Sequence, residues 1–99
     1  MNRTAKGTRN EKKCEDELIE RGYTTWRTFR SKYRQLDLFD IFDVCGVSAD
    51  GSHMLFVQVK SNKCDKSVRD KIRAFKMPDC CHKEVWIWID RKGWEKERL

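Results

Sequence analysis

Long apolar stretches are missing from this sequence. Charged residues interrupt every apolar run within a few positions, and none approaches the roughly 20 residues of a membrane-spanning helix. The first seven residues start with positive charge but lack the apolar segment of a secretory signal. Repeats, low-complexity tracts and Pro- or Ser-rich linkers are missing as well. We therefore expect one domain over residues 1–99, with residues 1–7 as a loose basic arm.

The sequence also lacks a regular cysteine framework. Its five cysteines are an odd number without the spacing of a disulfide scaffold, which favours free thiols in a reducing compartment. We therefore expect a cytoplasmic protein. Cys64, Cys80, Cys81 and His82 have the donor atoms of a zinc site, but adjacent cysteines fit the usual C-x₂-C geometry poorly. Partly buried, unreactive thiols are the better interpretation.

Negative charge is in the minority. The chain has 22 Lys and Arg against 16 Asp and Glu, a formal net charge of +6 and a pI of about 9.2. A positive field of this size favours a polyanionic partner, although basic runs usually form only a solvated surface. Contact with the phosphates of a nucleic acid is the other interpretation of these basic residues. The candidate nucleic-acid-binding residues are Lys6, Arg9, Arg27, Arg30, Lys32, Arg34, Arg69, Arg73 and Lys76.

Hydrophobic periodicity and turn signals predict a mixed α/β domain. The expected elements are helices over 8–21 and 67–76 and strands over 23–29, 38–47, 54–61 and 85–89. Asp50-Gly51 predicts a hairpin turn, and Lys92-Gly93 predicts a turn into a tail that can pair as an edge strand. The order α-β-β-β-α-β indicates a central mixed sheet flanked by helices.

Two neighbouring strands of this expected sheet carry polar side chains within apolar rows. Because strand side chains alternate between faces, Asp43 shares a face with the apolar Ile41 and Cys45, and Gln58 shares a face with Lys60. A charge in such a row costs on the order of several kcal/mol unless it is paired or binds a metal. An Asp43–Lys60 ion pair is therefore one interpretation, and a metal site is the other.

Glu11 supplies a third candidate group. At about 100° per residue it lies almost in line with Leu18, at the top of the apolar stripe of the first helix. Thr8-x-x-Glu11 also fits a capping box, and the two roles can coexist. Two acids and an amide oxygen can together hold one Mg²⁺, whose bound water can attack phosphorus. A lysine beside that water can stabilise the developing negative charge.

Three short motifs follow one another along the chain. They are Lys6-Gly7-Thr8-Arg9-Asn10-Glu11, then Asp40-Ile41-Phe42-Asp43-Val44, then Phe56-Val57-Gln58-Val59-Lys60-Ser61. Over residues 6–61 the sequence resembles the PD-(D/E)XK nuclease superfamily, and within it the archaeal-type Holliday junction resolvases. The resemblance implies a restriction-endonuclease-like core.

The resemblance also implies an Mg²⁺-dependent endodeoxyribonuclease, with Mn²⁺ as a substitute metal. The implied metal ligands are Glu11, Asp43, Gln58 and the backbone carbonyl of Val59, and the implied catalytic residues are Glu11, Asp43, Gln58 and Lys60. Gln58 stands where the superfamily carries a second acid, so one negative charge is lost and the metal should bind more weakly. Asp43 fits the motif best, with Asp37 and Asp40 as candidate assistants.

The leading hypothesis from the sequence is cleavage of DNA. Holliday junction resolution is the first expected activity, and a repair or restriction-type nuclease is the second. A domain this small that handles two strands is expected to act as a symmetric homodimer. Trp86, Trp88 and Trp94 can stack on bases, but such residues more often lie in the core or at an interface, and we favour the interface. The alternative is a non-catalytic nucleic-acid-binding domain with a degenerate nuclease site.

Overall fold

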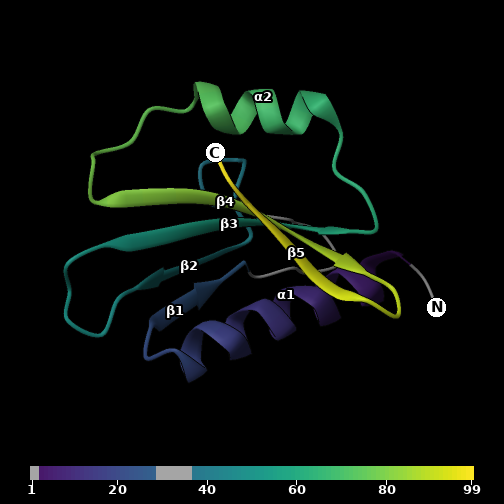
Figure 1. The fold of residues 1–99 in the computed structure, drawn as a ribbon, viewed down its shortest axis with the longest axis horizontal. Coiled ribbons are helices and arrows are strands. Elements are labelled where there is room, and N and C mark those ends of the chain that lie inside the picture. The colour runs from purple at the N-terminus through teal and green to yellow at the C-terminus, as the bar shows by residue number, and fades with distance from the viewer. Residues whose placement is uncertain (1–2, 29–36) are drawn as a thin grey trace.

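The computed structural model describes residues 3–28 and 37–99 as a five-stranded mixed sheet between two helices. The elements are α1 (Arg3–Glu20), β1 (Thr24–Arg27), β2 (Val44–Val47), β3 (Met54–Ser61), α2 (Lys66–Ala74), β4 (Cys81–Ile89) and β5 (Gly93–Arg98). The strands lie in the order β1-β2-β3-β4-β5, with β3 and β4 parallel and the other neighbours antiparallel. Figure 1 shows α1 on one face of the sheet and α2 on the other.

Helix α1 starts earlier than the sequence predicts. It begins at Arg3 rather than after Thr8, so residues 3–7 are helical and the expected loose arm is wrong for them. It ends at Glu20, one residue before the predicted end, and Gly22 terminates it as predicted. Gly22 has a φ of 93° and donates its N–H to Ile19, while Tyr23 donates to Leu18. These two bonds form a Schellman motif, which needs the left-handed conformation that glycine adopts easily.

The strand predicted over residues 38–47 is only half present. Strand β2 covers Val44–Val47, whereas residues 38–42 form a turn closed by an isolated bridge between Leu38 and Phe42. Phe39 and Asp40 both have positive φ angles, 56° and 59°, which break the alternation of a strand. The argument that assigned Asp43 to a face by strand alternation therefore fails, because the preceding residues are not extended.

The remaining elements agree more closely with prediction. Strand β3 has the predicted bounds, and the turn at Asp50-Gly51 joins it to β2. Helix α2 ends at Ala74, so Lys76 lies beyond it, and the amine of Lys83 donates to the carbonyls of Ile72 and Phe75 at 2.7 Å each. Strand β4 starts four residues early, at Cys81, and the tail does pair as the edge strand β5.

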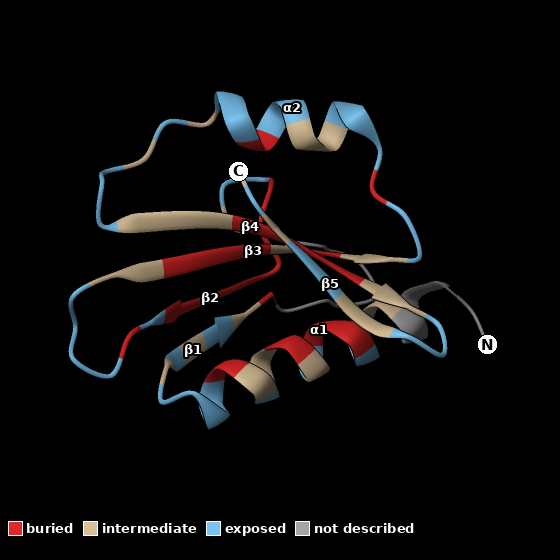
Figure 2. Cartoon of the chain, viewed as in Figure 1, coloured by how far each residue is buried: buried red, intermediate tan, exposed pale blue. Residues whose placement is uncertain are grey.

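The core has two parts, one on each side of the sheet (Figure 2). Beneath α1 it contains Cys14, Leu18, Val44, Leu55, Val57, Val59 and Trp86. Beneath α2 it contains Ile41, Phe42, Cys45, Phe56, Cys64, Ile72, Val85 and Ile87. All five cysteines are free thiols, as predicted. Neither α1 nor α2 has the length and apolar character that crossing a bilayer requires.

Candidate functional site

Asp43 is held by its backbone and by its side chain. Its N–H donates to the carbonyl of Val57 at 2.9 Å, and its carbonyl accepts from both the N–H and the hydroxyl of Thr28, at 2.8 and 2.7 Å. Its carboxylate oxygen Oδ2 accepts from the N–H of Val59 at 2.9 Å. With 2% of its surface exposed, Asp43 places a buried carboxylate against the backbone of β3, where the pairing with β2 ends.

Val59 presents its backbone to this carboxylate. The N–H and C=O groups of one strand residue point to the same edge of the strand. Because the N–H of Val59 reaches Asp43, its carbonyl also points to the Asp43 side of β3. This is the direction that the sequence prediction of a Val59 carbonyl ligand requires.

Glu11 is buried on the α1 side of the sheet, with 3% of its surface exposed. The capping-box interpretation is wrong, because Thr8 lies inside α1 and Glu11 is eight residues past its start. The preceding residue, Asn10, is also buried and donates its side-chain amide to the hydroxyl of Ser61 at 2.7 Å. This bond fixes the Glu11 turn of α1 beside the carboxyl end of β3.

The role of Asn10 was missed in the sequence. Asn10, Cys14 and Leu18 are spaced four apart, so they share one stripe of the helix. An amide on an otherwise apolar stripe, at a mid-helix position that asparagine does not favour, was the available signal.

Gln58 and Lys60 share one pocket, on the α2 side of the sheet. The pocket has a volume of about 180 Å³ and is lined by Asp37, Asp40, Ile41, Gln58, Lys60, Val68 and Lys71. This confirms that Gln58 and Lys60 face the same way. Asp43 is not among the residues that line this pocket, so the pocket joins Gln58 to Lys60, while the hydrogen bond at the backbone of β3 joins Asp43 to Val59.

Asp37 and Asp40 bring acids to that pocket. The turn at residues 38–42 places both Asp37 and Asp40 on the lining of the pocket that contains Gln58. The carboxylate of Asp40 is 93% exposed and lies 3.5 Å from the amine of Lys71, and Oδ1 of Asp37 is buried. The two predicted assistants of Asp43 therefore lie on the same side of the sheet as Gln58.

The donor chemistry of the site suits a hard cation. Within residues 3–28 and 37–99, no three His, Cys, Asp or Glu residues cluster closely enough to hold a metal ion. Glu11, Asp43 and the carbonyl of Val59, together with the amide oxygen of Gln58 from the α2 side of the sheet, offer the oxygen ligands that Mg²⁺ prefers. Two carboxylates and two neutral oxygens are the type of ligand that Mg²⁺ binds, but their total negative charge is small. We therefore expect Mg²⁺ to bind weakly.

The predicted basic residues fall into distinct groups. Arg9 and Lys76 are exposed. Arg27 lies 3.5 Å from Glu15, and Arg73 lies 3.5 Å from Asp70. The guanidinium of Arg69 donates to Glu97 at 2.9 and 2.6 Å and to the carbonyl of Cys64 at 2.6 Å, so it ties α2 to β5. The side chain of Lys6 and the whole of Arg30, Lys32 and Arg34 lie outside the described residues.

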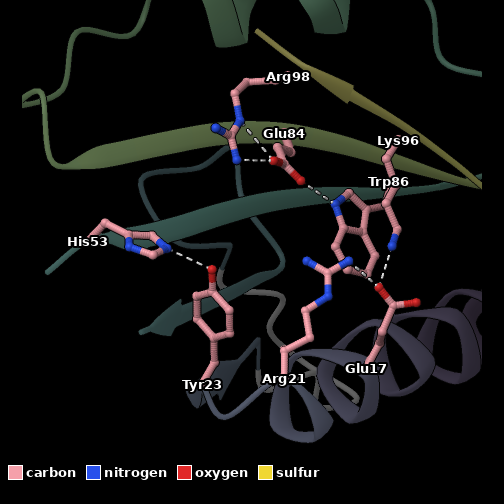
Figure 3. Close-up of polar contacts among 8 residues, drawn as sticks. All are labelled: Glu17, Arg21, Tyr23, His53, Glu84, Trp86, Lys96 and Arg98. Carbon is pink, nitrogen blue, oxygen red and sulfur yellow. Dashed lines mark hydrogen bonds and ion pairs between the residues drawn. The ribbon is translucent and has the colours of Figure 1, made fainter. Parts of the chain in front are cut away.

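Trp86 belongs to the core rather than to a binding surface. It is fully buried, and its indole N–H donates to Glu84 at 2.8 Å, as Figure 3 shows. Arg21 and Lys96 lie over its ring, at 5.4 and 4.2 Å from the centroid, and both pair with Glu17. Trp94 packs edge-on against it at 5.4 Å. Trp86 is therefore a core residue, the alternative to the favoured interface position, and its buried ring cannot stack on a base.

The fold is similar to that of a Holliday junction resolvase of known structure. The Holliday junction resolvase of Archaeoglobus fulgidus, an archaeal hyperthermophile, aligns with a TM-score of 0.66 over 94% of this chain and 72% of that chain. The two sequences are 19% identical. The chain therefore has the restriction-endonuclease-like α/β fold predicted from its sequence. No protein-family model matches the chain, and no curated protein matches it in sequence.

Proposed function

We propose that this chain is a metal-dependent endonuclease that hydrolyses phosphodiester bonds in DNA, as a member of the PD-(D/E)XK superfamily. The observation that carries the proposal is the buried carboxylate of Asp43 bonded to the N–H of Val59, the residue between Gln58 and Lys60. This bond fixes an acid on the backbone of β3 between an amide and a lysine, and these are the groups that a metal-dependent phosphodiesterase uses. The similar fold of an archaeal Holliday junction resolvase supports the proposal.

The site residues have two proposed roles, binding a metal ion and stabilising charge on the phosphate. Glu11, Asp43, Gln58 and the carbonyl of Val59 would hold Mg²⁺, with Mn²⁺ as a substitute. When bound, such an ion lowers the pKa of a water molecule and neutralises charge on the phosphate. The amine of Lys60 would stabilise the negative charge that develops on the phosphate oxygens.

Holliday junctions are the first proposed substrate, and the DNA of a repair or restriction-type reaction is the second. The positive net charge of +6 favours DNA as the partner, because each neutralised phosphate releases counterions. We also propose that two copies act together, since two symmetric copies place one site on each of two strands.

The second candidate function is a DNA-binding domain without catalysis. The observation in its favour is Gln58, because it leaves only two carboxylates, Glu11 and Asp43, in the proposed ligand set. Within the described ranges, moreover, no three His, Cys, Asp or Glu residues form a metal cluster. Weak metal binding would then leave DNA affinity intact and remove cleavage.

A cleavage assay separates the two functions. Labelled four-way junction, linear duplex and single-stranded DNA are incubated with the protein in Mg²⁺, in Mn²⁺ and in EDTA. We expect metal-dependent cleavage that is lost in Lys60→Ala and retained in Lys63→Ala, a matched control because Lys63 is exposed and follows three residues later. Binding without cleavage in either metal would establish the non-catalytic function. Cleavage retained in Lys60→Ala would contradict the assigned site.

A further inference from the structure

Phe39 is an aromatic residue held at the protein surface beside the Gln58–Lys60 pocket. It is 56% exposed, although it belongs to one of the most hydrophobic residue types. Its chain neighbours Asp40 and Ile41 both line the pocket. Burial in the core therefore does not account for the position of the ring.

The backbone at Phe39 is strained. Phe39 and Asp40 both adopt the left-handed conformation, which is unfavourable for residues with a Cβ atom. Hydrogen bonds hold the turn closed: Asp40 donates to Asp37, and Ile41 and Phe42 donate to Leu38. Backbone strain that the surroundings maintain in this way is concentrated at functional sites.

Helix α2 also fixes the turn. The amine of Lys71 donates to the carbonyl of Asp40 at 3.0 Å and lies 3.5 Å from its carboxylate. The ring of Phe39 rests on Phe75 and Phe56, with centroids 5.2 and 6.2 Å away. Phe56 precedes Gln58 by two residues on the same face of β3, roughly 7 Å along the strand. The ring is thus a rigid platform beside the pocket.

We propose that Phe39 stacks on a nucleobase of the DNA strand whose phosphate contacts Lys60. Lys71 is already paired with Asp40, so Lys60 is the amine of the pocket that a phosphate would contact, and the flat, half-exposed ring of Phe39 lies beside it. An amine and a flat ring match the two parts of one nucleotide, the phosphate and the base. A base within a continuous duplex has both faces covered by its neighbours. Phe39 therefore selects DNA with an exposed base, as at a branch, an end or a single strand. This inference rests on the proposed nuclease function, but its test measures DNA binding and does not require cleavage.

The test measures binding in EDTA, so that no cleavage occurs. The probe is 2-aminopurine, a fluorescent base, placed at the branch point of a four-way junction and, separately, inside a linear duplex. We expect the protein to change the fluorescence at the branch. Phe39→Ala should abolish this change and weaken junction binding about 5- to 150-fold, while duplex binding stays unchanged. Phe39→Trp should restore both.

Two further variants distinguish stacking from a general apolar contact. Phe39→Leu keeps an apolar side chain against Phe75 but has no flat face, so it should behave like Phe39→Ala. Trp26→Ala removes a 44% exposed aromatic of β1 and serves as the control that should have no effect. The proposal would be overturned if Phe39→Ala weakened binding to the junction and to the duplex equally, or if it weakened neither. It would also be overturned if the only effect of Phe39→Ala were to convert a dimer into a monomer. If the protein changes the fluorescence at the branch but cleaves no DNA in Mg²⁺ or Mn²⁺, stacking is supported and the proposed nuclease function is contradicted.

Discussion

At the scale of single residues, Asp43 has a structural role as well as its proposed chemical one. One oxygen of its carboxylate completes the hydrogen bonding of β3 by accepting from Val59, at the point where β2 no longer supplies a backbone partner. A variant that keeps this acceptor but removes the charge, such as Asp43→Asn, therefore separates the two roles. Most other substitutions at this position would disturb both at once.

Gln58 gives a prediction about metal affinity. Gln58→Glu restores a carboxylate in the pocket that it shares with Lys60, so Mn²⁺ should bind more tightly, on the order of tenfold. Titration calorimetry measures this directly. Asn62→Asp is the matched control, because it also adds one negative charge near the end of β3 but at an exposed position where Asn62 bonds Asp90. Equal effects of the two variants, or no effect of Gln58→Glu, would mean that Gln58 is not a ligand.

Some features of the site could be predicted from the sequence residue by residue, and others could not. Alternation along a regular strand placed Gln58 and Lys60 on one face, and helical periodicity placed Glu11 on the buried face of α1. Both inferences need only local geometry. The bond from Asn10 to Ser61 joins residues 51 positions apart, and the approach of Asp37 and Asp40 to Gln58 depends on a turn. Neither follows from spacing alone.

At the scale of elements, the predicted bounds were wrong where two local conformational preferences competed. Residues 38–42 are rich in apolar residues that favour a strand, but Leu38–Phe42 bonds and Lys71 hold them in a turn. At the start of α1, Thr8 is a good cap, yet the preceding Arg, Ala and Lys are good helix formers and the helix extends through them. Element type was predicted well, and element boundaries less so.

The turn between β2 and β3 gives a prediction about pH. Hydrogen bonds from Ser52 and Ser48 lower the pKa of Asp50 to about 2. A carboxyl whose pKa is lowered by folding stabilises the fold above its ordinary value of about 4, and the stabilisation is lost as pH falls through the folded value. Between pH 4 and pH 2, the free energy of unfolding should therefore fall less steeply in Asp50→Asn than in the wild type. Denaturant titrations at several pH values measure this free energy. The prediction would be refuted if the free energy of unfolding fell equally steeply with pH in both proteins.

At the scale of the whole molecule, the proposed site lies where both helices meet the same end of β3. Asn10 brings α1 to Ser61 from one face, and Val68 and Lys71 of α2 line the pocket with Lys60 on the other. The parallel pairing of β3 with β4 allows this, because α2 crosses over the sheet between them (Figure 1). The order of predicted elements indicated this architecture, whereas the link from Arg69 to Glu97 could be found only in three dimensions.

The charge of Asp43 is the part of this architecture on which the proposed activity depends. Single-turnover cleavage of a four-way junction in Mg²⁺ compares the wild type with Asp43→Asn, which can still accept the N–H of Val59. Asp16→Asn is the control, since it removes one exposed carboxylate from α1. We predict that Asp43→Asn cleaves at roughly one hundredth of the wild-type rate or less, with unchanged thermal stability, and that Asp16→Asn cleaves normally. Equal rates for all three proteins would contradict the account.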